Sequence, residues 1–350
     1  MATTEEAAIR VSPQALRRFA ADALEAAGMV AEEAAIVADS LVEADLRGIE
    51  THGIMRLPQY VQRVRAGGIR SPATLVWHPV APSCGLLDGG AGAGQVVGVR
   101  AMTRAVELAA ESGVGVVVVR NSNHLGTAGY FVLRALAHNM IGLVLTNADA
   151  SVVPFGGAAR FFGTNPLAIG VPSGQPFPVV LDMATSIVAF GRVLVAAQSG
   201  QAIPAGWAVD DRGQPTTDPR AALAGALLPA AGHKGYGLAF MVEVLTAMLG
   251  GGPYGPHLPQ SVLVDQPQML GHFLMAIDVP RFVGLEVFTS RVDAMIAELH
   301  TVPAVKTGGQ VLVPGEPEGR TYADRVRNGV PLRPAVRQEL ERLGPLPALG

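Results

Sequence analysis

Apolar residues recur at helical spacing over the first 70 residues of the chain. Ser12-Pro13 is a typical helix start, and glycines at positions 28, 48 and 67 stand where helices commonly end. The pattern predicts three helices, over residues 12–28, 31–47 and 59–65. The character of the sequence changes at Ser71-Pro72, so we predict a helical domain over residues 1–72.

Beyond residue 72, short apolar stretches alternate with helical ones. Strands are predicted at residues 85–88, 114–120, 141–146, 167–171, 179–182 and 273–278, and helices at residues 99–111 and 129–139. Strands that alternate with helices are typical of a layered α/β domain with a parallel sheet. We predict such a domain over residues 73–289.

Three further segments have their own character. Residues 238–249 are apolar nearly all round except for Glu243, which predicts a buried helix. Residues 200–219 are rich in proline and glycine and predict a turn-rich connection. Residues 334–343 predict a final surface helix, with a flexible tail after Gly344.

The composition favours a large buried interior. Hydrophobic residues make up 49% of the chain, charged residues only 16%, and the mean hydropathy is +0.33. Such a chain has apolar surface to spare for a contact between subunits, so we expect an oligomer. The net charge is -3 and no run of Lys or Arg stands out, which argues against a nucleic-acid partner. A small anionic substrate would need a local positive group.

Cysteine usage and hydropathy point to the cytoplasm. Cys84 is the single cysteine, which excludes an intrachain disulfide framework and a CxxC zinc or redox centre. The first residues lack the basic start and apolar stretch of a signal peptide. The longest uncharged segments, residues 161–181 and 244–264, are interrupted by glycine and proline, so we expect no membrane span. We also expect no metal centre.

The sequence from Thr51 to Arg56 carries a first candidate for chemistry. In helical backbone His52 and Arg56 would share one face, and Tyr60 would extend that face by one turn. An imidazole can exchange a hydroxyl proton near neutral pH, and a guanidinium can hold a carboxylate. The plainer alternative is that His52 caps a helix end and Arg56 is a surface charge.

A second candidate is the polar cluster of residues 120–126, where a valine-rich strand ends. Ligands of α/β proteins bind at such strand ends, and a turn here would let His124 face a nucleotide or a substrate. On local grounds it is as plausible that Asn121 and Asn123 merely cap the turn.

Glycine-rich segments give weaker signals. Residues 89–94 resemble a Rossmann loop, but the spacing is GxGxxxG and no acidic residue closes a following strand, so a turn explains them better. Residues 232–237 place His233 and Lys234 where a phosphate could bind. Residues 314–317 could present backbone groups or a carboxylate to a ribose. Walker lysine, HExxH and GxSxG motifs are absent.

Six motifs in order make the chain similar to the malate/L-lactate dehydrogenase family, a non-Rossmann group that includes ureidoglycolate, sulfolactate and diketogulonate dehydrogenases. They are residues 51–56, 121–126, 163–166, 181–186, 232–237 and 313–317. The resemblance covers residues 10–332. It implies a mixed, largely antiparallel sheet in place of the parallel one, a helical domain built from both chain ends, with residues 290–344 packing on residues 1–72, and a homodimer.

The resemblance also implies roles for single residues. His52 matches the proton donor or acceptor, oriented by Thr51, and Arg56 matches the group that grips the substrate carboxylate. In some relatives the histidine that matches His124 is the base, so both histidines are candidates. Thr164 matches a substrate contact. The expected contacts to NAD or NADP are His124, Leu125, Gly126, Thr127, Ala128, Asp182, Met183, Ala184, His233, Lys234, Pro314, Gly315 and Glu316.

The expected reaction is hydride transfer between NAD(P) and a small 2-hydroxy or 2-oxo carboxylate of the malate, L-lactate, ureidoglycolate or sulfolactate type. The alternative within the family is an NADPH-dependent cyclic imino acid reductase, in which the resemblance implies an aspartate near residues 189–192. This sequence has no acid there. From another class, a catalytically inactive nucleotide sensor is a third possibility. Candidates for contact to a 2'-phosphate are Lys234, Arg192 and Arg160.

Overall fold

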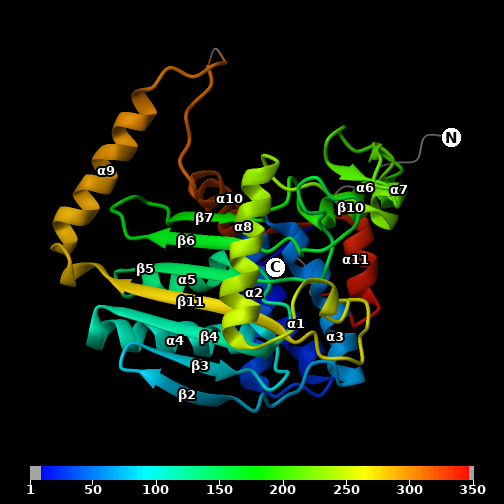
Figure 1. Ribbon diagram of the computed structural model, residues 1–350, viewed down its shortest axis with the longest axis horizontal. Coiled ribbons are helices and arrows are strands. Elements are labelled where there is room, and N and C mark those ends of the chain that lie inside the picture. The colour runs from blue at the N-terminus through cyan, green and yellow to red at the C-terminus, as the bar shows by residue number, and fades with distance from the viewer. Residues whose placement is uncertain (1–8, 307, 347–350) are drawn as a thin grey trace.

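The computed structural model describes residues 9–306 and 308–346 (Figure 1). The first residues, on which the signal-peptide expectation rests, and the last four of the predicted tail lie outside the described residues. None of the helices that the structure describes is long and apolar enough to cross a membrane.

Both chain ends contribute to one helical part. Its helices are α1 (Pro13–Glu25), α2 (Ala31–Leu46), α3 (Leu57–Ala66), α10 (Glu316–Asn328) and α11 (Pro334–Glu341). Strand β1 (Ile9–Val11) pairs antiparallel with β12 (Val330–Leu332), which ties the two ends together. Ser12 caps α1 because its Oγ accepts a hydrogen bond from Ala15 N at 3.1 Å. The helical part from both chain ends that the resemblance implied is confirmed, while its boundary at residue 72 stays a prediction.

The central sheet has seven strands in the order β2-β3-β4-β11-β5-β6-β7. Their bounds are β2 Val76–Ala81, β3 Cys84–Asp88, β4 Val114–Ser122, β5 Met140–Thr146, β6 Leu167–Val171, β7 Val179–Met183 and β11 Leu270–Asp278. Strands β3 and β4 pair in parallel, and every other pairing is antiparallel. The parallel sheet predicted from the alternating pattern is therefore wrong, and the largely antiparallel sheet is confirmed.

The reason is the position of β11. Strands β4 and β5 do run in the same direction, as in a parallel unit, but β11 lies between them and is antiparallel to both. This strand comes from more than 120 residues later in the chain than β5. A pattern of neighbouring residues does not reveal an insertion from so far away.

Two helices cover one face of the sheet. They are α4 (Gly94–Ser112), which begins five residues before the predicted start, and α5 (Gly129–Leu136). Their buried side chains form one core with β3, β4, β5 and β11, in which Phe131, Met102 and Leu274 are fully buried. This core fixes the loop between β4 and α5, which carries His124.

Helix α8 (His233–Glu243), continued by the π-helical turn η3 (Val244–Met248), crosses the other face of the sheet (Figure 1). Leu238, Phe240, Met241 and Leu249 are 45%, 48%, 51% and 59% exposed. The prediction that residues 238–249 form a buried helix is therefore wrong for these side chains in the single chain, although Glu243 is buried. An apolar pattern on all sides does not say which molecule covers it.

The remaining elements lie at the periphery. A small unit holds α6 (Phe190–Ser199), α7 (Pro219–Ala224) and a three-stranded sheet of β8 (Ala208–Val209), β9 (Pro215–Thr216) and β10 (Ala226–Leu227). Helix α9 (Leu285–Thr301) extends away from the body of the molecule (Figure 1). Short helical turns are η1 (Glu50–His52), η2 (Ile54–Arg56), η4 (Gly255–His257) and η5 (Val279–Arg281).

Candidate active site and nucleotide pocket

The segment that carries His52 and Arg56 is not one helix. It forms the turns η1 and η2, which meet at Gly53. Ile54 N donates a 2.7 Å hydrogen bond to Oδ2 of the buried Asp45 on α2, which anchors the junction. Arg56 still folds back on this segment, because its Nε donates to Thr51 O at 2.7 Å. The two side chains are therefore neighbours through a different backbone from the predicted helix.

His52 is half-buried beside a hydroxyl and a guanidinium. Its Nδ1 lies 3.0 Å from Thr51 Oγ1, a contact that is compatible with the orienting role that the resemblance implies for Thr51. Burial, together with the smaller effect of the positive charge of Arg56, lowers the pKa of His52 to about 4. The ring is neutral at pH 7.

His124 comes to the same place from the loop after β4. Its ring stacks on that of His52, with centroids 5.7 Å apart. Its Nδ1 lies 2.6 Å from the hydroxyl of Tyr60 on α3. Burial lowers the pKa of His124 well below its usual range, and the charges of His52 and Arg56 add to this effect. His124 is neutral at pH 7 as well.

Asn123 holds the loop in this position. Its Nδ2 donates to the carbonyl oxygens of Ala91 and Gly92, and its Oδ1 accepts from Arg63 Nη2 and Gln268 N. The asparagine thus stabilises the turn, as the plainer alternative proposed, and in doing so it presents the neighbouring histidine to the site.

Gln95, which sequence reasoning missed, completes the cluster. It is the second residue of α4 and is fully buried, and its Nε2 donates to Tyr60 Oη at 2.7 Å. Burial raises the pKa of Tyr60 to about 12, so the phenol keeps its proton. The available signal was a lone amide in the otherwise apolar first turns of the helix.

Residues 189–192 pack against this cluster. A Cβ atom at Gly191 would lie 3.1 Å from both Cβ and Cγ2 of Thr51 and 3.8 Å from Arg56 Nη2. The stretch in which imine reductases are expected to carry an aspartate therefore does border the site. A larger side chain at position 191 would require its neighbours to shift.

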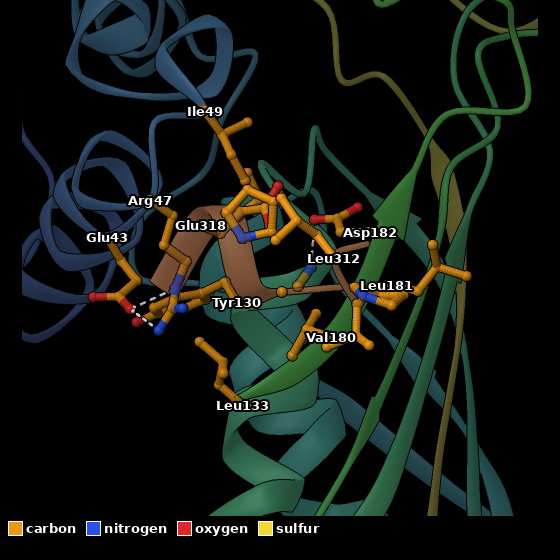
Figure 2. A pocket seen from close by; sticks show the side chains of 16 residues that line it. Glu43, Arg47, Ile49, Tyr130, Leu133, Val180, Leu181, Asp182, Leu312 and Glu318 are labelled. Carbon is orange, nitrogen blue, oxygen red and sulfur yellow. Dashed lines mark hydrogen bonds and ion pairs between the residues drawn. The ribbon is translucent and has the colours of Figure 1, made fainter. Parts of the chain in front are cut away.

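A pocket of about 330 Å³ lies between the helical part and the edge of the sheet at β7 (Figure 2). Its lining includes Thr127, Asp182, Pro314 and Gly315, all of which were expected to contact the nucleotide. Residues that sequence reasoning missed line the rest: Glu43, Arg47, Ile49, Gly129, Tyr130, Leu133, Val180, Leu181, Leu312, Val313, Pro317 and Glu318.

The pocket combines apolar walls with polar ends, which fits an adenosine group. Leu133, Val180 and Leu312 offer surfaces for a flat ring (Figure 2). Asp182 Oδ2 accepts a 2.8 Å hydrogen bond from Gly129 N at the start of α5. Burial raises the pKa of Asp182 to about 6, so at pH 7 its carboxylate can accept bonds from a ribose hydroxyl.

The other expected nucleotide contacts are more dispersed. Leu125 and Ala128 are buried in the loop between β4 and α5, and Gly126 in the same loop adopts φ +81°. Met183 and Ala184 follow Asp182 along the chain. His233 and Lys234 lie exposed at the start of α8 and do not line the pocket. Thr164 contributes its carbonyl oxygen to Thr185.

The carboxylate of Glu316 is bound within the protein and is not free to contact a nucleotide. It is buried, and its oxygens bind Arg320, His300 and Val313 N at 2.6, 3.0 and 3.2 Å. These partners lower the pKa of Glu316 against the opposing effect of burial. At this segment the backbone at residues 314 and 315 is what faces the pocket.

The described residues contain no group of three or more His, Cys, Asp or Glu side chains arranged to hold a metal ion. The polar side chains that the structure brings together at the site are those of His52, His124, Tyr60 and Arg56.

Comparison with known proteins places this geometry in context. A family model described as malate/L-lactate dehydrogenase matches residues 11–341. Malate dehydrogenase from Pyrococcus abyssi is 39% identical over 97% of this chain and 95% of its own length. Malate/(S)-sulfolactate dehydrogenase from Methanothermus fervidus is 39% identical over 95% of this chain and 96% of its own length.

Solved structures agree. The structure of malate dehydrogenase from Entamoeba histolytica matches with a TM-score of 0.93 and 34% identity, and the match covers 97% of this chain and 100% of that chain. The names of other relatives specify either nucleotide, as in ureidoglycolate dehydrogenase (NAD(+)) from Escherichia coli O157:H7 and (2R)-3-sulfolactate dehydrogenase (NADP(+)) from Chromohalobacter salexigens.

Proposed function

This chain belongs to the malate/L-lactate dehydrogenase family, and we propose that it oxidises a small 2-hydroxy carboxylate reversibly with a nicotinamide nucleotide. The observation that carries the proposal is the convergence of two neutral imidazoles, those of His52 and His124, and the guanidinium of Arg56. Thr127, on the same loop as His124, lines the pocket whose walls suit an adenosine group. A proton acceptor and a carboxylate anchor are what oxidation at C2 of a hydroxy acid requires.

The nucleotide would be held by the pocket of Figure 2. Leu133 and Leu312 would contact its adenine, and Asp182 would accept from a ribose hydroxyl. When bound, its nicotinamide supplies the acceptor for the hydrogen and electron pair that leave C2 of the substrate. Thr127, on the loop that also carries His124, links the pocket to the histidine pair.

Arg56 is the proposed anchor for the substrate carboxylate. Its Nε is fixed by Thr51 O at 2.7 Å and its Nη1 approaches Gln59 Oε1 at 3.4 Å. These contacts hold the guanidinium plane and leave donors of both terminal nitrogens for a carboxylate. The charge of Arg56 also keeps protons off the neighbouring imidazoles.

His124 is the proposed proton acceptor. Its Nδ1 is engaged at 2.6 Å by the hydroxyl of Tyr60, a closer contact than the 3.0 Å between His52 Nδ1 and Thr51 Oγ1. When Nδ1 carries the ring proton and donates it to Tyr60 Oη, the Nε2 atom of His124 can take the hydroxyl proton, while His52, stacked beside it, orients the same oxygen. The lowered pKa of His124 makes it release this proton readily to solvent.

The proposal is tested with malate, L-lactate, ureidoglycolate and sulfolactate, each with NAD and NADP. We expect turnover of at least one acid, lost in His124→Ala with nucleotide binding retained. Absence of turnover with every pair would overturn the proposal. Loss in His52→Ala but not in His124→Ala would transfer the proton role to His52. Piperideine-2-carboxylate with NADPH is included, and we expect no reduction because residues 189–192 contain no acid.

We further propose a cytoplasmic homodimer. The single cysteine suits a reducing compartment. The exposed apolar side chains of α8 and η3, among them Phe240, Met241 and Leu249, form a contiguous helical surface that we term the α8 face. A second copy of this chain is the proposed occupant, since an apolar face of this kind is buried in oligomers.

A further inference from the structure

Gln95, Tyr60 and His124 form a chain of hydrogen bonds from three separate elements. Gln95 Nε2 lies 2.7 Å from Tyr60 Oη, and Tyr60 Oη lies 2.6 Å from His124 Nδ1. Gln95 is 0% exposed and Tyr60 is 4% exposed, so water does not compete with these contacts. The chain ends at the imidazole to which the proposed function assigns the proton.

The protons along this chain are tightly constrained. The phenol has one proton, and burial raises its pKa to about 12, so it remains a phenol. When Gln95 Nε2 donates to Tyr60 Oη, the Tyr60 proton points to His124 Nδ1. Nδ1 is then an acceptor, and the neutral ring carries its proton on Nε2. In this arrangement Nε2 of His124 can donate a hydrogen bond to the substrate but cannot accept its proton.

The opposite arrangement is available because the other end of the amide is unengaged. Gln95 Oε1 is buried and has no hydrogen-bond partner among the described residues. A half-turn of the amide exchanges Oε1 and Nε2, after which Tyr60 donates to Oε1 and accepts from His124 Nδ1. The ring then exposes a lone pair at Nε2, and His124 accepts a proton from the substrate.

Each arrangement leaves one polar end of Gln95 without a partner. In the first it is Oε1 and in the second it is Nε2, and the penalties for such buried groups are of the same order, about 1 to 3 kcal/mol. The amide therefore does not strongly select one state. A glutamine with both ends satisfied would lock the histidine in a single tautomer.

We propose that Gln95 is a positioning residue that, through Tyr60, lets neutral His124 alternate between an Nε2 that donates a hydrogen bond and an Nε2 that accepts a proton. The inference rests on the proposed function for its use: oxidation of a hydroxy acid needs the accepting form, which becomes an imidazolium when it takes the hydroxyl proton. Reduction of a 2-oxo acid runs back through the same imidazolium, whereas the form that carries its proton on Nε2 can only hydrogen-bond to the substrate oxygen. The proton that Nε2 takes from a hydroxyl is passed to solvent, which restores the neutral ring.

The electrostatic surroundings of His124 support a neutral ring throughout. The groups that face it are His52 and Arg56 from the turns η1 and η2, Tyr60 and Arg63 from α3, and His272 from β11. None of these carries a negative charge at pH 7. Interconversion between two neutral tautomers is therefore the route that does not require a buried imidazolium at rest.

The test is the tautomer of His124 in the nucleotide-free protein, measured by nitrogen-15 NMR of labelled histidine and assigned with His124→Ala. We expect exchange-averaged shifts of Nδ1 and Nε2 in the parent protein. In Gln95→Leu, Tyr60 has His124 Nδ1 as its remaining acceptor, so the shifts should move to the form protonated at Nε2. The matched control Gln62→Leu, at an exposed position on α3, should leave them unchanged.

A double variant shows whether the effect of Gln95→Leu passes through Tyr60 or comes from a general folding defect. With Tyr60→Phe the link to position 95 is cut, so Tyr60→Phe and Tyr60→Phe/Gln95→Leu should give the same ring shifts. The same fixed tautomer in the parent protein and in Gln95→Leu would overturn the inference. So would a change caused by Gln95→Leu in the Tyr60→Phe background.

Kinetics add a second readout. We expect kcat/KM for the acid in Gln95→Leu to fall about tenfold in both directions, with the nucleotide affinity retained. Failure of the proposed function is distinguishable, since the ring shifts need no turnover. If the ring shifts respond to Gln95→Leu but the protein has no dehydrogenase activity, the tautomer switch stands and the proposed function fails. If the protein is active but the ring shifts do not respond, the proposed function stands and the tautomer switch fails.

Discussion

Gly53 and Asp45 approach so closely that a Cβ atom at position 53 would lie 1.9 Å from Asp45 Oδ1. The same carboxyl group accepts the 2.7 Å hydrogen bond from Ile54 N that fixes the junction of η1 and η2. His52 precedes this junction and Arg56 follows it. The spacing of His52 and Arg56 thus requires a residue without a side chain at position 53.

We predict that Gly53→Ala disrupts both the junction and the site. The added methyl group must displace Asp45 or the backbone that carries His52, and overpacking of this kind costs about 1 to 3 kcal/mol. The unfolding free energy should fall by this amount, and kcat/KM should fall more than tenfold. Denaturant unfolding and steady-state kinetics measure the two effects.

The matched control is Gly284→Ala, before α9, where an added Cβ meets nothing within 4 Å. It should leave stability and activity near those of the parent protein. A Gly53→Ala protein with unchanged unfolding and kinetics would show that the junction tolerates a side chain.

Asp45 predicts a pH dependence of stability. Burial raises its pKa from 3.8 to about 7, with Glu50 adding to the rise and Ile54 N, Arg325 and Arg333 opposing it. The folded state therefore holds a proton that the unfolded state releases, so this stabilisation is complete below pH 3.8 and is lost as the pH rises through 7. Its size is at most about 4 kcal/mol.

We expect Asp45→Asn to remove most of the fall in Tm between pH 5 and pH 8, since an amide oxygen still accepts from Ile54 N without titrating. Asp182, whose pKa is raised to about 6 by burial, contributes a slope of the same sign that remains in the variant. Thermal unfolding at a series of pH values measures this. Equal slopes for the parent protein and Asp45→Asn would contradict the assignment.

Much of the fold could be predicted from the sequence because strands such as β4, β5 and β11 are largely buried apolar runs. The predicted bounds of strand β6 (Leu167–Val171) and of helix α5, which begins at Gly129, agree with the structure to within a few residues. The position of β11 was not, because pairing between distant segments has no local signal. The pattern of residues 238–249 likewise identified apolar surface but not the molecule that covers it.

The site was predictable where a short motif carried it. His52, Arg56 and Tyr60 lie in one segment, and His124 closely follows the end of a strand, so each could be found by inspection. Gln95 and pocket residues such as Tyr130 could not, because their role arises when separate helices meet. Glu316 shows the converse: a carboxylate in a matching motif is engaged by Arg320 and His300.

Arg56 provides a test of the carboxylate anchor. We predict that Arg56→Lys raises KM for the acid about tenfold to hundredfold with a smaller effect on kcat, because an ammonium group lacks the planar fork that Thr51 O and Gln59 orient. Steady-state kinetics with saturating nucleotide measure this. Arg65→Lys, on the exposed side of α3, is the control. An unchanged KM would remove Arg56 from the substrate site.

The charges of the nucleotide pocket predict a preference for NAD over NADP. Glu43, Asp182 and Glu318 line the pocket, and its one arginine, Arg47, is already paired with Glu43 at 2.8 Å. A 2'-phosphate placed here would face uncompensated negative charge. The candidates Lys234, Arg192 and Arg160 do not line the pocket.

We expect KM for NADP to exceed that for NAD about tenfold or more, and Glu318→Gln to narrow the gap by improving the use of NADP. Glu339→Gln, on the surface helix α11, is the control with the same loss of charge. Kinetics with both nucleotides decide the matter. An enzyme that prefers NADP and is indifferent to Glu318→Gln would place the adenosine end outside this pocket.

The α8 face predicts the oligomeric state. Met241 is 51% exposed and Phe240 is 48% exposed within one chain, so a charge introduced here should cost little in a monomer and much in an interface. We expect the parent protein to have twice the chain mass in light scattering and Met241→Lys to shift toward the chain mass at micromolar concentration. Val80→Lys, at a 72% exposed position on β2, should remain a dimer. A Met241→Lys protein that stays dimeric would assign the contact to another surface.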